Sequence, residues 1–317
     1  MPKPYVRRPP LAPEGLDWLW IPLTIWAGFA QTLRNAAQRH LIADLGTLGA
    51  TLVRFLYGLP FALVWLFVVL IAGYDSLPGL NWRFIAWVGE GAIAQIAATA
   101  LLLRVMNERN FTLGVAYSKT ELVQVAFFGL LFLGDPLDSL TALAVGLATL
   151  GVLLLSPAEP GRTVGAFLTG WASRTALLGL GSGTCFALAA VGYRGAALEL
   201  EPAPFLLAAA YTLVWAQVLQ TVLLGGWLTW RDAGIAGRLI EAWRPSLLAG
   251  FMGAAASVGW FTAMAIEPVA HVRTLGLVEL IFSYVLSRRI FRERLARLEI
   301  YGIGLLCLGL IAIVLRG

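Results

Sequence analysis

Charged side chains are scarce in this sequence. Asp, Glu, Lys and Arg make up 13% of the 317 residues, whereas hydrophobic residues make up 59%. A soluble domain carries about 25% charged residues. With so few charges, most helices must be apolar all round, and such helices need lipid as their solvent. The scarcity of charge therefore excludes an ordinary soluble domain and predicts an all-α integral membrane protein.

Residues that build catalytic and metal sites are scarce as well. The two histidines and the two cysteines lie far apart, without the spacing of metal ligands or of a disulfide. The motifs of serine hydrolases and zinc proteases are absent from the sequence. The net charge is +5, but no basic run is interleaved with aromatics. We therefore expect no enzyme activity, no metal or other cofactor and no nucleic-acid partner, and we attribute the basic residues to loops beside the lipid bilayer.

Ten apolar stretches are long enough to cross a bilayer, which takes about 20 helical residues. We predict a first half over residues 1–156, which includes a short N-terminal tail at 1–17. A polar linker over 157–173 separates it from a second half over 174–317. The ten predicted helices are 18–40, 46–73, 82–105, 111–133, 137–155, 174–198, 204–227, 245–266, 269–291 and 295–315.

The two halves repeat one another. A shift of 158 or 160 residues places like residues of the halves together: Glu121 on Glu279, Asp135 on Glu293, Gly146 on Gly304, Gly151 on Gly309 and Arg34 on Arg194. Because each half has an odd number of helices, the halves must cross the membrane in opposite directions. The predicted fold is ten transmembrane helices in two inverted five-helix repeats. Secondary transporters use such repeats, with the substrate site near the midplane where the repeats meet.

Each half also ends with the same pattern. A glutamate opens an apolar helix, an acidic turn follows, and a Gly-containing helix closes the half; Glu121 to Asp135 and Glu279 to Glu293 carry it. On these segments the chain resembles the EamA-type branch of the drug/metabolite transporter superfamily, over nearly its whole length. Leu122 stands where the family pattern has proline. The resemblance implies a ten-helix carrier of small organic solutes in the bacterial inner membrane, working by alternating access.

The orientation in the membrane is predicted in two opposite ways. The resemblance and the basic residues Lys3, Arg7 and Arg8 near the N-terminus favour cytoplasmic termini. The arginines at the C-terminal end of the predicted ninth helix and after it, among them Arg288, Arg289 and Arg292, favour the reverse by the positive-inside rule.

Four charges at membrane depth are the main candidates for a substrate site, since each charge costs about 2.5–3.5 kcal/mol to insert. Lys119 and Arg273 would suit a substrate carboxylate or phosphate. The alternatives are a local ion pair for Lys119 and snorkelling to the interface for Arg273. Glu121 and Glu279 either bind a proton or a substrate amine, or fix the crossing of the fourth and ninth helices through hydrogen bonds.

Other candidates have ordinary alternatives. Glu90 either forms a buried ion pair with Arg54 or takes up a coupling proton. Tyr117 and Trp260 either line a cavity or pack against helices and lipid. Arg34 and its repeat equivalent, Arg194, lie near predicted helix C-termini, where a cation complements the helix dipole.

The sequence predicts a secondary-active transporter, an exporter of small polar organic metabolites such as amino acids or related zwitterions and anions. Its partners would be a small-molecule substrate, the bilayer and protons as a candidate coupling ion. A flippase for lipids or lipid-linked sugars on the same scaffold is the alternative. The sequence specifies no oligomeric state.

Overall fold

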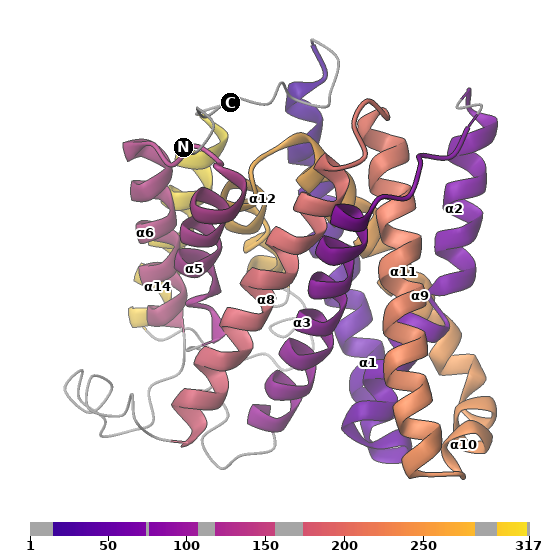
Figure 1. Ribbon diagram of the computed structural model, residues 1–317. Coiled ribbons are helices and arrows are strands. Elements are labelled where there is room, and N and C mark those ends of the chain that lie inside the picture. The colour runs from indigo at the N-terminus through magenta and orange to yellow at the C-terminus, as the bar shows by residue number, and fades with distance from the viewer. Residues whose placement is uncertain (1–14, 74–75, 107–117, 156–173, 283–296, 316–317) are drawn as a thin grey trace.

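The computed structural model describes residues 15–73, 76–106, 118–155, 174–282 and 297–315 (Figure 1). Within these ranges the chain is helical and has no strand, which confirms the all-α prediction. After a short helix η1 (Asp17–Leu19), the elements are α1 (Trp20–Leu56), α2 (Leu59–Ile71), α3 (Trp82–Met106), α5 (Glu121–Phe128), η2 (Gly129–Leu133), α6 (Ser139–Leu155), α8 (Arg174–Leu198), α9 (Phe205–Arg231), α10 (Ile235–Glu241), α11 (Trp243–Ile266), α12 (Val269–Leu275) and α14 (Arg297–Val314).

Five segments of the described chain are long and apolar enough to cross a membrane, and three shorter apolar helices accompany them. The long segments are Leu41–Ile71, Trp82–Leu102, Ala176–Leu198, Phe205–Arg231 and Trp243–Ile266. The full set of ten spanning helices and their inverted order stay predictions, because parts of the fourth and ninth predicted helices lie outside the described residues.

Helix α1 contains a reversal of the chain at Gly46. This glycine has φ of 67°, in the left-handed region that suits glycine. The Nε2 of Gln38 donates to the carbonyl oxygen of Ala50 at 2.8 Å. Twelve residues of straight helix would separate these two by about 18 Å. The element is therefore a hairpin of two limbs, as the predicted boundary between the first and second helices requires.

The second predicted helix is itself divided before α2. A turn at residues 57–58 ends α1, and Pro60 then occupies the first turn of α2. Proline lacks a backbone N–H, which costs nothing in the first turn of a helix.

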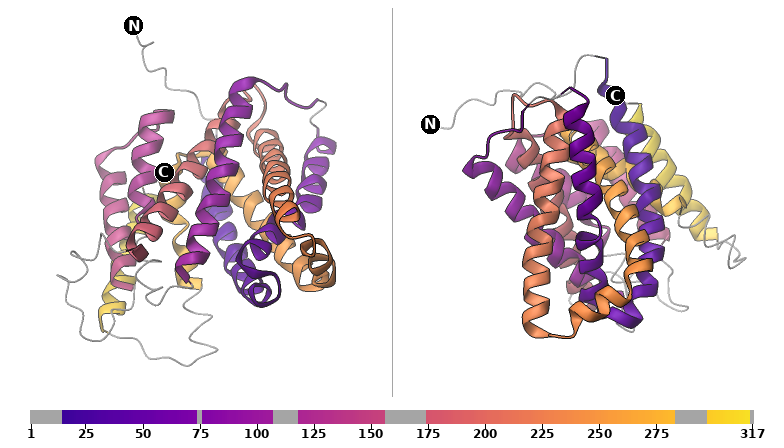
Figure 2. Two further views of the ribbon diagram at one scale, coloured as in Figure 1. Left: turned by 60° about the horizontal axis from the view of Figure 1, so that its bottom comes forward. Right: turned by 90° about the vertical axis from the view of Figure 1, so that its right-hand side faces the viewer.

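Three helix pairs make the most extensive contacts: α1 with α11, α3 with α8, and α6 with α14. In Figures 1 and 2, α5, α6 and α14 gather on one side, α1, α2, α9 and α11 gather on the other, and α3 and α8 lie between them. The repeat exchanges the first helix with the sixth and the third with the eighth, so it converts the α3–α8 pair into the α11–α1 pair. The contacts therefore have the pairing that an internal two-fold relation predicts.

Paired glycines allow the α6–α14 contact. A Cβ added at Gly151 would lie 2.7 Å from the carbonyl oxygen of Gly302, and one at Gly309 would lie 2.8 Å from that of Ala144. Gly151 and Gly309 are repeat equivalents, and each lets the partner backbone approach.

Helix α10 was not predicted. It lies between α9 and α11, and it buries Ile235 and Leu239 against the turn of the α1 hairpin. Its seven residues are too few to cross a membrane, so a search for bilayer-length apolar stretches passed over it.

Candidate functional site

Two helices that carry the predicted site residues are interrupted beside them. The chain forms a turn at 119–120, directly before α5, and another at 276–277, directly after α12. Backbone hydrogen bonds there tighten from four-residue to three-residue spacing: the N–H of Leu122 donates to the oxygen of Lys119, and that of Glu279 to the oxygen of Gly276. Such tightened turns inside helices often mark hinges or functional sites. The predicted ninth helix, continuous over 269–291, is thus wrong at 276–277.

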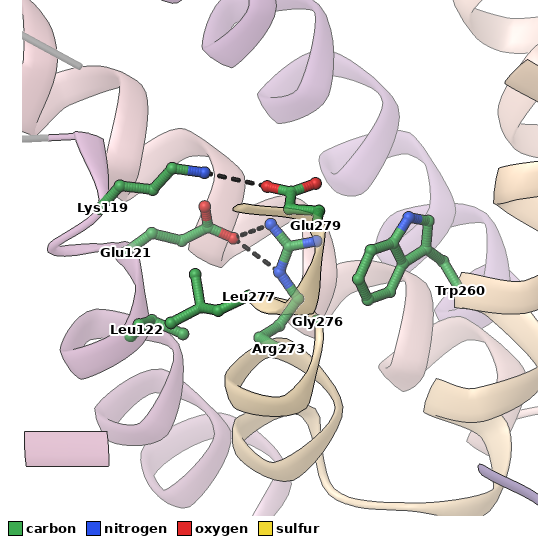
Figure 3. A pocket seen from close by; sticks show the side chains of 8 residues that line it. All are labelled: Lys119, Glu121, Leu122, Trp260, Arg273, Gly276, Leu277 and Glu279. Atoms are coloured by element: carbon green, nitrogen blue, oxygen red, sulfur yellow. Dashed lines mark hydrogen bonds and ion pairs between the residues drawn. The ribbon is translucent and has the colours of Figure 1, made fainter. Parts of the chain in front are cut away.

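Two ion pairs connect these interrupted helices (Figure 3). The Nζ of Lys119 lies 3.0 Å from Oε1 of Glu279. The Nε of Arg273 donates to Oε1 of Glu121 at 2.7 Å, and Nη2 of the same guanidinium contacts that oxygen. Each interrupted helix contributes one acid and one base, so the four charges sum to zero.

Helix α11 and the first limb of α1 hold this group from the other side. The guanidinium carbon of Arg273 lies 5.0 Å from the centroid of the Trp260 ring, within the range of a cation–π contact. The Nε1 of Trp260 donates to Oε1 of Gln31 at 3.1 Å, and Nε2 of Gln31 donates to Oε2 of Glu279. Gln31 therefore links the aromatic contact to the carboxylate.

The ion pairs enclose almost no free volume. Only about 10 Å³ remains among Lys119, Glu121, Trp260, Arg273 and Glu279, which is room for about one water molecule. The four charged side chains are 8–22% exposed. The site is therefore closed on its own ion pairs, and a solute that enters must replace at least one of them.

Five of the seven predicted site residues thus lie together: Lys119, Glu121, Arg273, Glu279 and Trp260. The alternative of local pairing for Lys119 matches its contact with Glu279, and Arg273 is held by Glu121 rather than extended to the interface. Tyr117 lies outside the described residues.

Glu90 occupies a different place. It lies on α3 against Gly192 of α8, and within the described ranges its buried Oε2 has no hydrogen-bond partner. The predicted ion pair with Arg54 is wrong. The Arg54 guanidinium lies instead over the Phe55 ring, 5.5 Å from its centroid. Similar depth in the membrane suggested the pair, but depth does not say which way two helices turn their side chains.

Arg194 connects three elements. Its Nε donates to Oδ1 of Asp135 at 3.1 Å, and its Nη1 donates to the carbonyl oxygens of Met264 and Glu267 at 2.6 and 2.8 Å. Asp135 in turn accepts a hydrogen bond from the N–H of Val269 at 3.3 Å. Arg194 therefore complements a helix C-terminus, as predicted, but that terminus belongs to α11 rather than to its own helix.

Sequence reasoning missed the polar residues that join the helices. Gln31 reaches Glu279, and a second group joins the Tyr193 hydroxyl, Gln95 and Gln220 across α3, α8 and α9 at 2.7–2.8 Å. The signal that could have found them is a glutamine inside an apolar span, since a buried amide needs partners. Within the described ranges, no group of three or more His, Cys, Asp or Glu residues could hold a metal ion.

Comparisons with known proteins agree with this architecture. Residues 173–315 match the EamA-like transporter family. No curated protein matches the chain. A solved crystal structure aligns over 95% of this chain and 96% of its own length, with a TM-score of 0.66 at 13% identity, which shows a shared fold. The chain is accordingly a multi-pass integral membrane protein, and its residues 173–315 match the EamA-like transporter family of the drug/metabolite transporter superfamily.

Proposed function

We propose that the protein is a secondary-active, alternating-access transporter that exports small zwitterionic or anionic metabolites across the bacterial inner membrane. The observation that carries the proposal is the charge-balanced set of two ion pairs that join the turn before α5 and the start of α5 to α12 and the residues that follow it. The proposal includes no catalytic step, and the family match supports this, since that family is one of transporters.

The ion pairs suit a solute that carries both charges. Removing one member of a buried pair leaves an unpaired charge, which costs about 3–5 kcal/mol. A zwitterion avoids this cost, because its carboxylate can take Lys119 or Arg273 while its ammonium takes Glu279 or Glu121. In the empty carrier, the four charged residues would pair with one another. In the loaded carrier, they would pair with the charges of the solute, so no charge would be unpaired in either state.

The proposed architecture is two inverted halves over 1–156 and 174–317, with the interrupted helices α5 and α12 at repeat-equivalent places. The exchange of helix contacts and the glycine pair between α6 and α14 support it. Rocking of one half against the other would break the α5–α12 ion pairs from one side at a time. A proton that replaces Lys119 on Glu279 would couple this motion to a proton gradient.

Counterflow in proteoliposomes tests the function. Vesicles are loaded with unlabelled leucine, putrescine or succinate, and entry of the labelled compound is followed. We expect saturable exchange of leucine or succinate and none of putrescine. Lys119→Gln and Glu279→Gln should reduce this exchange about a hundredfold, whereas Arg238→Gln, a change at an exposed ion pair, should not reduce it. An inward-directed proton gradient should accelerate export in the wild type and not in Glu279→Gln.

The same proteoliposomes also test the flippase alternative. If none of the three solutes exchanges while a fluorescent phosphatidylethanolamine crosses the vesicle membrane, the scaffold moves lipid and the solute proposal is wrong. If Lys119→Gln and Glu279→Gln exchange leucine at the wild-type rate, the assignment of the site is wrong.

A further inference from the structure

Arg34 is a buried arginine whose donors are largely unused. It lies on the first limb of α1 and is 5% exposed. One nitrogen, Nη2, donates to Oδ1 of Asn35 at 2.8 Å, whereas Nε and Nη1 have no hydrogen-bond partner among the residues that the structure describes. A guanidinium has five N–H donors and stays charged in proteins. Unsatisfied buried donors are rare in native structures and call for an explanation.

A second buried arginine, Arg54, packs on the same glycine of α11 as Arg34 does. Arg54, on the second limb of the α1 hairpin, is 7% exposed. A Cβ added at Gly253 of α11 would lie 3.3 Å from Cγ of Arg54 and 3.4 Å from Cδ of Arg34. The reversal at Gly46 therefore sets two cations against one face of α11.

The acidic neighbour of Arg34 is already engaged. Within the described chain, the charge of Arg34 is opposed by Arg54 and Arg273 and attracted by Glu279. Glu279, however, is bound by Lys119 and Gln31. Gln31 precedes Arg34 by three residues, so the two occupy the same face of α1. Arg34 thus lies beside the ion-pair site with donors to spare.

We propose that Arg34 and Arg54 form a binding site for an oxyanion, the carboxylate or phosphate of the transported solute. The inference rests on the proposed function and extends it: the negative group of the solute binds the two arginines, and its positive group exchanges with Lys119 on Glu279. A planar guanidinium matches both oxygens of a carboxylate or phosphate, and the buried surroundings strengthen the contact. The free donors of Arg34 are those that the solute fills.

Thermal unfolding in detergent tests the site without a transport assay. Sodium acetate, succinate and phosphate are compared with sodium chloride at equal ionic strength. At a hundredfold excess over Kd, a bound anion should raise the unfolding midpoint by about 5 °C. A mixed micelle containing phosphatidylglycerol forms a separate arm. A shift with soluble anions identifies a solute group, a shift with the lipid alone identifies a headgroup, and no shift in either arm overturns the proposal.

Arg34→Met is the decisive variant. It removes an uncompensated charge and keeps the length of the side chain, so the midpoint without anion should rise and the response to anions should disappear. Arg194→Met is the matched control. Its unfolding midpoint should fall, because Arg194 makes its hydrogen bonds to groups of the protein itself. Its response to anions should persist. Arg54→Met should also weaken the response, and it replaces Arg34→Met if that variant does not fold.

Two further results would overturn the inference. One is a fall in the midpoint of Arg34→Met with an unchanged anion response. The other is restoration of the midpoint in Arg34→Glu by Glu293→Arg, the repeat equivalent of Asp135, which would identify a resident partner for Arg34. If either of these results is found while leucine or succinate still exchanges, the binding site is rejected and the proposed transport function is retained. A lost exchange with an intact anion response would instead reject transport and keep the site.

Discussion

Arg34 and Arg194 occupy equivalent positions in the repeat but have opposite surroundings. Arg194 binds a carboxylate and two backbone carbonyls. Arg34 binds one neighbouring amide, and two of its nitrogens have no partner in the described part of the chain. Both are buried. The same residue type therefore fastens helices together in one half and provides free donors in the other.

The ion-pair site shows the same mixture of symmetry and divergence. Its acids, Glu121 and Glu279, are repeat equivalents. Its bases are not: the position equivalent to Lys119 is Leu277, beyond the end of α12, while Arg273 lies within α12. The predicted repeat thus matches the two acids but not the two cations, so the two ion pairs need not have equal strength or equal roles.

The largest expected effect is the loss of stability when Arg194, the fully partnered arginine, is replaced. Arg194→Met leaves Asp135 as a buried charge with only the N–H of Val269, and we expect a loss of about 3–5 kcal/mol in the free energy of unfolding. Denaturant titration in mixed micelles measures it. Asp135→Asn alone and the double variant complete a cycle that isolates the pair. If Arg34→Met costs as much as Arg194→Met, the contrast between the two halves is false.

The next effect compares the two glutamates. Glu121→Gln and Glu279→Gln should each reduce solute exchange about a hundredfold, because each leaves one cation unpaired, a difference of about 2.7 kcal/mol. Only Glu279→Gln should also remove the dependence on a proton gradient, because Glu279 has the weaker point-charge partner. Equal loss of gradient dependence in both variants would remove the proposed division of roles.

Alanine substitutions at the two repeat-equivalent glycines between α6 and α14 should reduce the stability of the protein by similar amounts. Gly151→Ala and Gly309→Ala each place a methyl group against the partner backbone, and each should destabilise the protein by about 1–2 kcal/mol. Gly146→Ala and Gly304→Ala are matched controls, since a Cβ there meets nothing within 4 Å. Unfolding midpoints of the four variants decide the matter. Sensitivity at one interface glycine only would show that the contact is not symmetric.

The smallest effect lies outside the spanning helices. The hydrogen bond from Arg238, helped by the N–H of Gly234, lowers the pKa of Asp232. A lowered pKa in the folded state adds stability above the unfolded-state pKa, and this stability is lost as the pH falls through the folded-state pKa. Asp232→Asn should therefore make the unfolding midpoint slightly less sensitive to pH below about 4. Arg238→Gln should have the same effect, and a larger change would mean that α10 depends on this exposed pair.

The sequence predicted the long helices well and their contacts less well. The prediction of 174–198 coincides with α8, because a run of apolar residues in lipid leaves few choices of boundary. The turns beside Lys119 and at Gly276 escaped prediction, since hydropathy averages over a break of two residues. Glu121 and Glu279 were found because charge is costly in lipid. The contrast between Arg34 and Arg194 was not foreseeable, because their partners come from distant helices.

The Trp260 ring contacts other parts of the site besides Arg273. Its ring also occupies the space where a Cβ at Gly276 would stand, 2.8 Å from Cζ3, and its nitrogen is bound to Gln31. A single change of rotamer would release the amide that binds Glu279, uncover the guanidinium and free the turn after α12 in one step. In the proposed transport cycle, opening of the ion-pair site and loosening of the interrupted helix would then be a single event.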